Sequence, residues 1–210
     1  MNKVVNWVKE EINKMNNKNR LLEIKDNALS EHIPIIMDET LLEIEKRLEE
    51  SKPTKILEIG TAVGYSAICF SKFLTENGKI DTIERDIERA NEAKENIKQM
   101  ELEDKINIIV GDAVEILPTL NEKYDMIFID AAKGKYPFFL NESLRLLADN
   151  GTIFADNILY KGYVMSDYNK HKQRTAVRNL REYIKEVTEN PNLETEILEV
   201  GDGLAVTKVK

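Results

Sequence analysis

The chain has 210 residues, of which 42% are hydrophobic and 32% charged, a balance typical of one α/β domain with a sizeable core. Its net charge of −8 excludes the molecule as a whole as a non-specific nucleic-acid binder, which leaves room only for a local basic face. The single cysteine, Cys69, excludes an intramolecular disulfide and no apolar run approaches membrane-spanning length, so we expect a cytoplasmic protein without a membrane partner.

Two helical patterns open the chain. Apolar residues recur at helical spacing within residues 1–16 and again within residues 41–48, shortly before Pro53. We expect them to form a helical N-terminal extension, residues 1–52, of a single domain that spans residues 1–210.

From residue 55 onward, short β-like runs alternate with amphipathic stretches. The runs are 55–59, 79–84, 105–110, 124–130 and 151–156, and the helical stretches lie around 65–75, 87–100, 112–118 and 136–147. This alternation predicts a doubly wound parallel sheet with helices on both faces. A last helix, about 171–189, precedes two strand-like runs that a short glycine-containing turn joins, which predicts an antiparallel hairpin at the sheet edge.

A glycine-containing turn, from Glu58 to Ser66, follows the first predicted strand. Gly60 and Gly64 let the backbone turn tightly and approach a ligand closely. Ser66 lies where the next helix exposes free N–H groups. Glycines also occur at such turns for structural reasons alone, so this motif leaves both interpretations open.

Acidic residues end the next two strands. Glu84 comes 20 residues after Gly64, where a carboxylate can accept hydrogen bonds from both ribose hydroxyls. The third strand ends in Gly111-Asp112-Ala113, where Asp112 either meets an adenine amino group or caps the following helix. Together these strand ends favour an adenosine-containing ligand, and the missing three-glycine pattern disfavours a pyrophosphate.

Strand four ends in Asp130 and strand five in Asp156-Asn157. If the two strands are neighbours, two carboxylates and an amide oxygen meet at one rim, a ligand set suited to Mg²⁺, Mn²⁺ or Ca²⁺. Lys133 lies three residues beyond Asp130, where a nearby cation would depress its pKa and make it a general base. The alternatives are carboxylates that only cap the following segments and a solvated lysine.

Six features, in this order, resemble the cation-dependent O-methyltransferases: ILEIGTAVGYSA, the strand end at Glu84, VGDA, FIDAAKGKY, ADNILYKG and VGDGLAVTK. That family includes catechol and caffeoyl-coenzyme A O-methyltransferases, and the resemblance runs from about His32 to Lys210. It implies a seven-stranded class I methyltransferase fold, a homodimer, S-adenosylmethionine and magnesium. The short N-terminus, residues 33–35 and the basic stretch after Gly162 are most similar to bacterial methyltransferases that act on tRNA 5-hydroxyuridine and produce 5-methoxyuridine at the wobble position.

The resemblance also assigns roles to residues. It implies a methyl-donor site at Met37, Ser66, Glu84, Asp112, Ala113 and Asp130, which Glu58, Gly60, Gly64 and Gly111 complete, metal ligands at Asp130, Asp156 and Asn157, and a base at Lys133. Tyr136 is assigned to the donor or substrate wall, although an aromatic residue that opens a helix is more often packing. A metal that chelates two vicinal oxygens orients the acceptor and stabilises its anion. A catechol carries such a pair, and 5-hydroxyuridine carries one in O4 and O5.

Residues 161–185 contain seven basic and two acidic side chains, a net charge of +5 in an acidic chain. Arg174, Arg178 and Arg181 share one helical face and, with Lys161, are expected to contact RNA phosphates. A solvated helix face is the alternative interpretation. We therefore expect tRNA as the acceptor, with small catechol or caffeoyl-type phenols as the alternative.

Two further hypotheses fall outside methyl transfer. An NAD-binding oxidoreductase would use Gly60, Gly64 and Glu84 as a dinucleotide site, but it leaves the predicted metal ligands unexplained. A non-catalytic sensor of an adenosine-containing ligand would tolerate the loss of those ligands, yet all of them are present.

Overall fold

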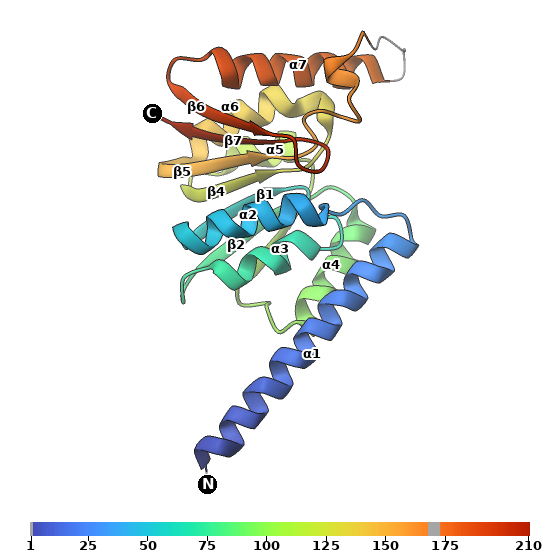
Figure 1. Ribbon diagram of the computed structural model, residues 1–210, viewed down its shortest axis with the longest axis vertical. Helices are drawn as coiled ribbons and strands as arrows, with labels where there is room; N and C mark the ends of the chain where they lie inside the picture. The colour runs from blue at the N-terminus through green and yellow to red at the C-terminus, as the bar shows by residue number, and fades with distance from the viewer. Residues whose placement is uncertain (1, 168–172) are drawn as a thin grey trace.

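The computed structural model describes residues 2–167 and 173–210, without the side chains of residues 2–6 and 8–10. Within this part of the chain seven strands form one sheet: β1 Lys55–Ile59, β2 Lys79–Glu84, β3 Ile106–Val110, β4 Tyr124–Ile129, β5 Leu147–Ala155, β6 Leu193–Leu198 and β7 Leu204–Val209. Their order is β3-β2-β1-β4-β5-β7-β6 (Figure 1). β1 to β5 pair in parallel, whereas β7 is antiparallel to β5 and β6. The predicted doubly wound sheet and its C-terminal hairpin are confirmed.

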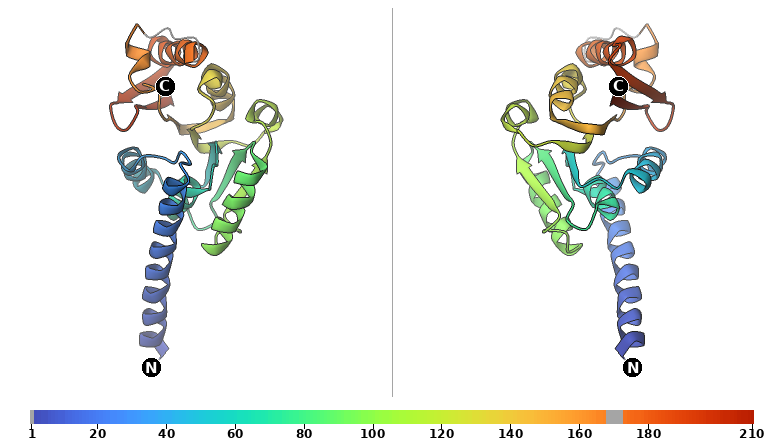
Figure 2. Two further views of the ribbon diagram at one scale, coloured as in Figure 1. Left: turned by 90° about the vertical axis from the view of Figure 1, so that its right-hand side faces the viewer. Right: turned by 90° about the vertical axis from the view of Figure 1, so that its left-hand side faces the viewer.

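Helices cover both faces of the sheet (Figures 1 and 2). Their bounds are α1 Asn2–Ser30, α2 Asp38–Ser51, α3 Tyr65–Phe70, α4 Ile87–Gln99, α5 Ala113–Ile116, α6 Tyr136–Leu146 and α7 Arg174–Glu189, with short 3-10 turns η1 Ser71–Phe73, η2 Leu117–Thr119, η3 Lys133–Lys135 and η4 Tyr163–Met165. One core holds side chains from α1 to α4, and the other holds side chains from α5 to α7.

Strand residues alternate between the two cores. Ile56 and Phe128 pack in the core with α1 to α4, whereas Leu57 and Ile127 pack in the core with α5 to α7. β1 and β4 are buried along almost their whole length because helices cover both of their faces. The central strands therefore carry continuous apolar runs, and their carboxyl ends are held rigidly in place.

Two elements are longer than predicted. α1 continues to Ser30 instead of ending near residue 16, because Ile24 and Ala28 pack in the core beyond a polar stretch, 16–20, that interrupts the apolar pattern. β5 begins at Leu147, ahead of Asn150-Gly151. This dipeptide is typical of a turn, but in the structure it lies inside the strand, where the pairing with β4 is irregular. None of the described helices, α1 included, is long and apolar enough to cross a membrane.

Candidate functional site at the carboxyl ends of the strands

The carboxyl ends of β1 to β5 form one rim, and each strand end is hydrogen-bonded to the next. Four backbone bonds join them: Gly111 N to Glu84 O (2.8 Å), Gly60 N to Ile83 O (3.0 Å), Asp130 N to Ile59 O (3.0 Å) and Asp156 N to Ile129 O (3.0 Å). These bonds extend the parallel ladder to the residues that follow the strands. The rim therefore brings together predicted site residues from five separate strand ends.

The turn after β1 approaches the end of β4 closely. Gly60 has a φ of 108°, and a Cβ atom at this position would collide with the main-chain oxygen of Asp130. Gly64, with a φ of 81°, starts α3. Only glycine avoids both the strained φ and this collision, so the packing of the turn against β4 requires glycine at position 60, and the approach to a ligand stays a prediction.

Glu84 closes this turn from the end of β2. Its Oε2 accepts a hydrogen bond from the backbone N–H of Ala62 (2.9 Å), and its Oε1 accepts one from Asp86 (2.9 Å). The side chain is only partly buried. Because a carboxylate oxygen accepts more than one hydrogen bond, Glu84 can hold the turn and still accept from the hydroxyls of a ligand.

Beneath the turn lies a buried polar network around Glu58. This carboxylate is fully buried and accepts hydrogen bonds from Ser66 Oγ (2.5 Å) and from Thr82, whose hydroxyl also lies 2.6 Å from that of Thr61. Burial raises the pKa of Glu58 to about 7, against the lowering effect of the two hydroxyls. Glu58 and Ser66 therefore support the turn from below, and Thr61 and Thr82 join them although sequence reasoning missed both.

The remaining predicted donor residues lie at the margins of the rim. Asp112 is exposed and caps α5, since it accepts a hydrogen bond from Val114 N (2.8 Å), and Ala113 begins that helix. The sequence left two roles open for Asp112, and the structure shows the one in which it caps the helix. Met37 precedes α2, is 49% exposed and lies beside Gly201 in the β6–β7 loop.

Two of the predicted metal ligands, Asp130 and Asn157, contact the ammonium group of Lys133. Its Nζ lies 2.8 Å from Asp130 Oδ1 and 2.8 Å from Asn157 Oδ1. The third residue, Asp156, is fully buried, and its Oδ1 accepts from Asn157 N (2.7 Å). Its Oδ2 is buried without a hydrogen-bond partner among the described residues, and burial, together with Asp130, raises the pKa of Asp156. Two of the three predicted ligands thus contact the ammonium group, and the third, Asp156, lies buried beside Asn157 with one unsatisfied oxygen.

The pKa of Lys133 in the chain alone reflects its oxygen neighbours, and the depression expected beside a cation stays a prediction. Burial lowers the pKa of Lys133, but Tyr136 and Asp130 offset this effect and leave the pKa above its usual value instead of depressed. The sequence-based expectation counted on a neighbouring metal ion, whereas the chain itself surrounds Lys133 with oxygen atoms. In the chain alone Lys133 is therefore an ammonium group that neutralises Asp130.

Tyr136 lies inside the core and not on an open wall. It is fully buried, and its hydroxyl donates to the backbone oxygen of Asp156 (2.7 Å) and accepts from Lys133 Nζ (3.1 Å). It therefore tethers η3 to the end of β5 and orients the lysine. This agrees with the packing role that aromatic residues at the start of a helix often have.

The loop that carries Asn157 is braced by the C-terminal hairpin. Asp202 accepts hydrogen bonds from the backbone N–H groups of Leu159 (to O, 3.0 Å) and Lys161 (to Oδ1, 2.6 Å). At Gly203, whose φ is 88°, a Cβ atom would collide with Leu159. Sequence reasoning treated this glycine-containing turn only as a hairpin connection. Asp202, the acidic residue within the turn, was the signal that could have indicated its second role, the support of the loop that carries Asn157.

The predicted basic face divides into two groups. Arg174, Arg178 and Lys161 are exposed. Arg181 is exposed as well, but it is bound to the η4 segment, because its guanidinium donates to the backbone oxygens of Val164 (2.9 Å) and Ser166. The three arginines thus differ in their contacts. Lys170 and Lys172, which also belong to the predicted basic stretch, lie outside the described residues.

The helix that carries the exposed arginines packs against the turn beside the candidate metal site. α7 packs against η3, the turn that carries Lys133. Asn179 on α7 donates through Nδ2 to the backbone oxygen of Gly134 (2.6 Å), and the side chain of Thr175 lies beside the same glycine. A positive surface therefore adjoins the rim where Asp130 and Asn157 meet.

Comparisons with known proteins agree with this geometry. Residues 13–210 match a family model described as O-methyltransferase. The chain is 36% identical over 164 residues to a catechol O-methyltransferase of Niastella koreensis, which covers 74% of this chain and 73% of that protein. It is 30% identical to a caffeoyl-CoA O-methyltransferase of Stellaria longipes, over 75% of this chain and 68% of that one. The crystal structure of a Bacillus cereus O-methyltransferase in complex with SAH superimposes with a TM-score of 0.82 at 26% identity, covering 91% of both chains.

Proposed function

Because the chain belongs to the O-methyltransferase family, we propose that it transfers the methyl group of S-adenosylmethionine to a hydroxyl of a phenol with two vicinal oxygens. The observation that carries this proposal is the meeting of Asp130, Asn157 and Lys133 at the rim, directly beside the turn at Gly60. Donor and acceptor sites that adjoin in this way suit an in-line displacement, in which oxygen, carbon and sulfur must be aligned.

The donor would lie over the glycine turn. Glu84 offers carboxylate lone pairs to ribose hydroxyls, and Gly60 lets the turn lie directly against the end of β4. Support also comes from the SAH complex of the B. cereus structure, since SAH is what remains of the donor after methyl transfer. Glu58 and Ser66 would contribute from below by fixing the turn, not by direct contact, because both are buried.

A divalent cation fits the residues at the ends of β4 and β5. Asp130, Asp156 and Asn157 would hold it, as hard oxygen ligands. The unsatisfied Oδ2 of Asp156 and the raised pKa of this carboxyl group support the assignment, since both reflect uncompensated negative charge. Magnesium or manganese bound there would supply a Lewis acid that orients two vicinal oxygens and favours the phenolate.

Lys133 is placed to stabilise the acceptor oxygen as an anion. Its Nζ lies at the rim between Asp130 and Asn157, so a phenolic oxygen brought to these residues would meet the lysine as well. The ammonium form donates a hydrogen bond that stabilises a phenolate oxygen. Tyr136 fixes the lysine from behind through the contact of 3.1 Å.

Small phenols take precedence over tRNA as the acceptor, because the relatives described above bear the names of catechol and caffeoyl-CoA enzymes. tRNA carrying 5-hydroxyuridine is the second candidate. One observation favours it, namely the exposed Arg174 and Arg178 on the helix that packs against η3. The NAD-dependent alternative is abandoned, because it accounts neither for the family nor for the oxygen ligands at the rim.

The experiment that tests the proposal compares acceptors at equal enzyme concentration. Purified protein is incubated with labelled S-adenosylmethionine, Mg²⁺ and either catechol, a caffeoyl thioester or tRNA carrying 5-hydroxyuridine. Label in the phenols supports the proposal. Label in tRNA alone transfers it to the second candidate, and label in none of them contradicts both acceptor assignments.

A further inference from the structure

One face of α7 lies against η3, the turn that carries Lys133. α7 packs on α6 as well as on this turn (Figure 1). Its buried side chains belong to the core that α5 and α6 also fill: Leu180, Tyr183 and Val187. Thr175, Asn179 and Tyr183 follow one another at intervals of four residues, which places them on one side of the helix. A helix fixed in the core thus presents a row of three side chains to the turn.

Each of these three side chains contacts η3 or Tyr136, the residue that follows it. Asn179 donates through Nδ2 to the backbone oxygen of Gly134 (2.6 Å). The side chain of Thr175 lies beside the same glycine. The ring of Tyr183 meets the ring of Tyr136 edge-on, with 5.6 Å between the centroids. α7 therefore holds the chain at two points, in the turn and directly after it.

The backbone oxygen of Gly134 lacks the usual donor of a 3-10 turn. Such an oxygen accepts from the N–H group three positions further on, but here that residue is Pro137, which has none. Asn179 supplies a donor from α7 instead. Arg178 Nε donates to Asn179 Oδ1 (3.3 Å), which leaves Nδ2 of the amide for the glycine oxygen. The amide of Asn179 is thus oriented on one side and bound on the other.

A fixed turn matters because the side chain of Lys133 is long and flexible. Its four-carbon stem lets Nζ occupy many positions unless the backbone and the ammonium group are both held. Tyr136 and Asp130 hold the ammonium group, at 3.1 and 2.8 Å from Nζ. The bond from Asn179 to Gly134, the next residue in the chain, holds the backbone. A displacement of about 1 Å in such a support is enough to impair the alignment of a reacting group.

We propose that Asn179 is a positioning residue for Lys133, which acts through the backbone oxygen of Gly134 and keeps the ammonium group at the rim. Only its effect on turnover rests on the proposed function, because the position of Lys133 is a property of the chain itself. α7 thereby has a part in the site that is separate from the arginines on its exposed face.

The test replaces Asn179 by leucine, which is similar in size and favours a helix but has no hydrogen-bond donor. Asn179→Ala repeats the test without a side chain that crowds the turn. Glu182→Leu makes the same apolar replacement at an exposed position of α7 and is the matched control. Thermal unfolding verifies that each variant is folded.

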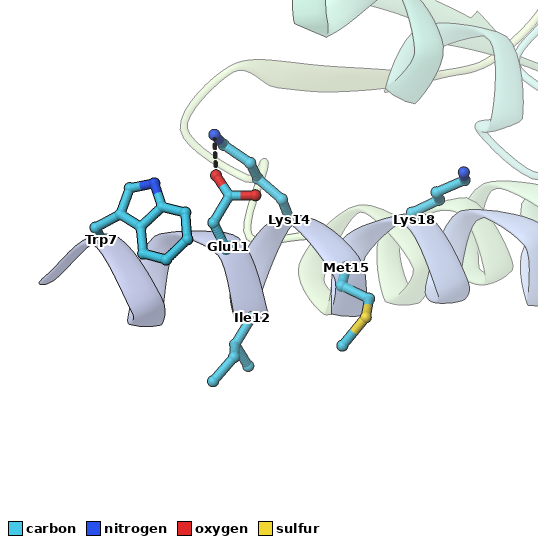
Figure 3. Close-up of a pocket in the computed structure, with 6 residues that line it drawn as sticks. All are labelled: Trp7, Glu11, Ile12, Lys14, Met15 and Lys18. Atoms are coloured by element: carbon cyan, nitrogen blue, oxygen red, sulfur yellow. Dashed lines mark hydrogen bonds and ion pairs between the residues drawn. The ribbon is translucent and has the colours of Figure 1, made fainter. Parts of the chain in front are cut away.

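The first measurement follows the Lys133 ammonium group without any turnover. Acetic anhydride acylates accessible amines, and peptide mass spectrometry reports the rate at each lysine. Lys135, exposed on the same turn, and Lys18, exposed on α1 (Figure 3), are the internal references. We expect Asn179→Leu to accelerate acylation of Lys133 by about threefold or more relative to both references, the scale of one lost hydrogen bond. Glu182→Leu should leave the rate unchanged.

The second measurement separates turnover from binding. Asn179→Leu should lower kcat by about tenfold and leave S-adenosylmethionine affinity, measured by calorimetric titration, unchanged. Lys133→Met has already lost the ammonium group, so the addition of Asn179→Leu to it should lower kcat no further.

Unchanged acylation of Lys133 in folded Asn179→Leu and Asn179→Ala would overturn the proposal, and so would equal acceleration in Glu182→Leu. A further loss of kcat in the double variant would overturn it as well, because Asn179 would then act through another group. Wild-type kcat in Lys133→Met would contradict the proposed role of the lysine in turnover. Faster acylation in Asn179→Leu would still support the positioning of Lys133 by Asn179 in that case.

Discussion

Lys133 and Asn157 are joined across the rim, with 2.8 Å between Nζ and Oδ1, although they lie on the loops after two different strands. We predict that Lys133→Met lowers kcat by about 100-fold or more, the usual effect of losing a donor that stabilises the reacting oxyanion, and leaves S-adenosylmethionine affinity unchanged. Lys135→Met is the matched control, since Lys135 is an exposed lysine of the same turn. Equal losses in both variants would contradict a specific role for Lys133.

Glu84 should be essential for donor affinity. We expect Glu84→Ala to weaken S-adenosylmethionine binding by about 1 to 3 kcal/mol, the scale of hydrogen bonds to a charged group. Part of this loss reflects the turn, because Ala62 N loses its acceptor. Calorimetric titration measures the affinity, with the exposed Glu88→Ala as control. Unchanged affinity in Glu84→Ala would remove Glu84 from the donor site.

Divalent cations should stabilise the protein through Asp156. Ligands that bind only the folded state raise its melting temperature, so Mn²⁺ should raise the Tm of the wild type and EDTA should reverse the rise. Asp156→Asn should abolish this response, whereas Asp149→Asn, an exposed carboxylate near the start of β5, should retain it. Calorimetry without acceptor provides the same comparison independently of turnover. A full Mn²⁺ response in Asp156→Asn would contradict the site.

Stability should fall as the pH rises through neutrality, in part because of Glu58. Burial raises its pKa from 4.5 to about 7, so folding favours the protonated form. The resulting stabilisation is complete below about pH 4.5 and is lost as the pH rises through 7, at a scale of about 1.4 kcal/mol per pKa unit. Urea denaturation at pH 5 and pH 8 should show a smaller difference for Glu58→Gln than for wild type or for the exposed control Glu115→Gln. An equally large difference in stability between pH 5 and pH 8 for Glu58→Gln would exclude Glu58 as a source of the pH dependence.

The arginines of α7 should separate into two classes. Arg181→Ala should lower the free energy of unfolding by about 1 to 3 kcal/mol, because the backbone oxygens of Val164 and Ser166 lose a charged donor. Arg174→Ala and Arg178→Ala should leave stability unchanged and should weaken only the binding of a polyanionic acceptor. Denaturation curves together with tRNA titrations at two salt concentrations distinguish these outcomes. A stable Arg181→Ala protein would show that its bonds to η4 contribute little.

The sequence predicts the sheet and its rim well for a physical reason. Apolar runs and turn residues report local structure, and the carboxyl ends of parallel strands necessarily meet at one edge. Sequence periodicity cannot report which side chain finds a distant partner. Arg181 shares a helical face with Arg174 but is bound by η4, and Glu58 is buried because Ser66 and Thr82 supply hydroxyls beneath the turn.

The brace at Asp202 also makes the acceptor side of the rim depend on a distant part of the chain. Asn157 lies on a loop held by the hairpin of β6 and β7, and β7 is inserted between β5 and β6. Without β7 the chain can form β1 to β4 but cannot hold this loop in place. A truncation that removes β7 should therefore leave the glycine turn present without an assembled acceptor site.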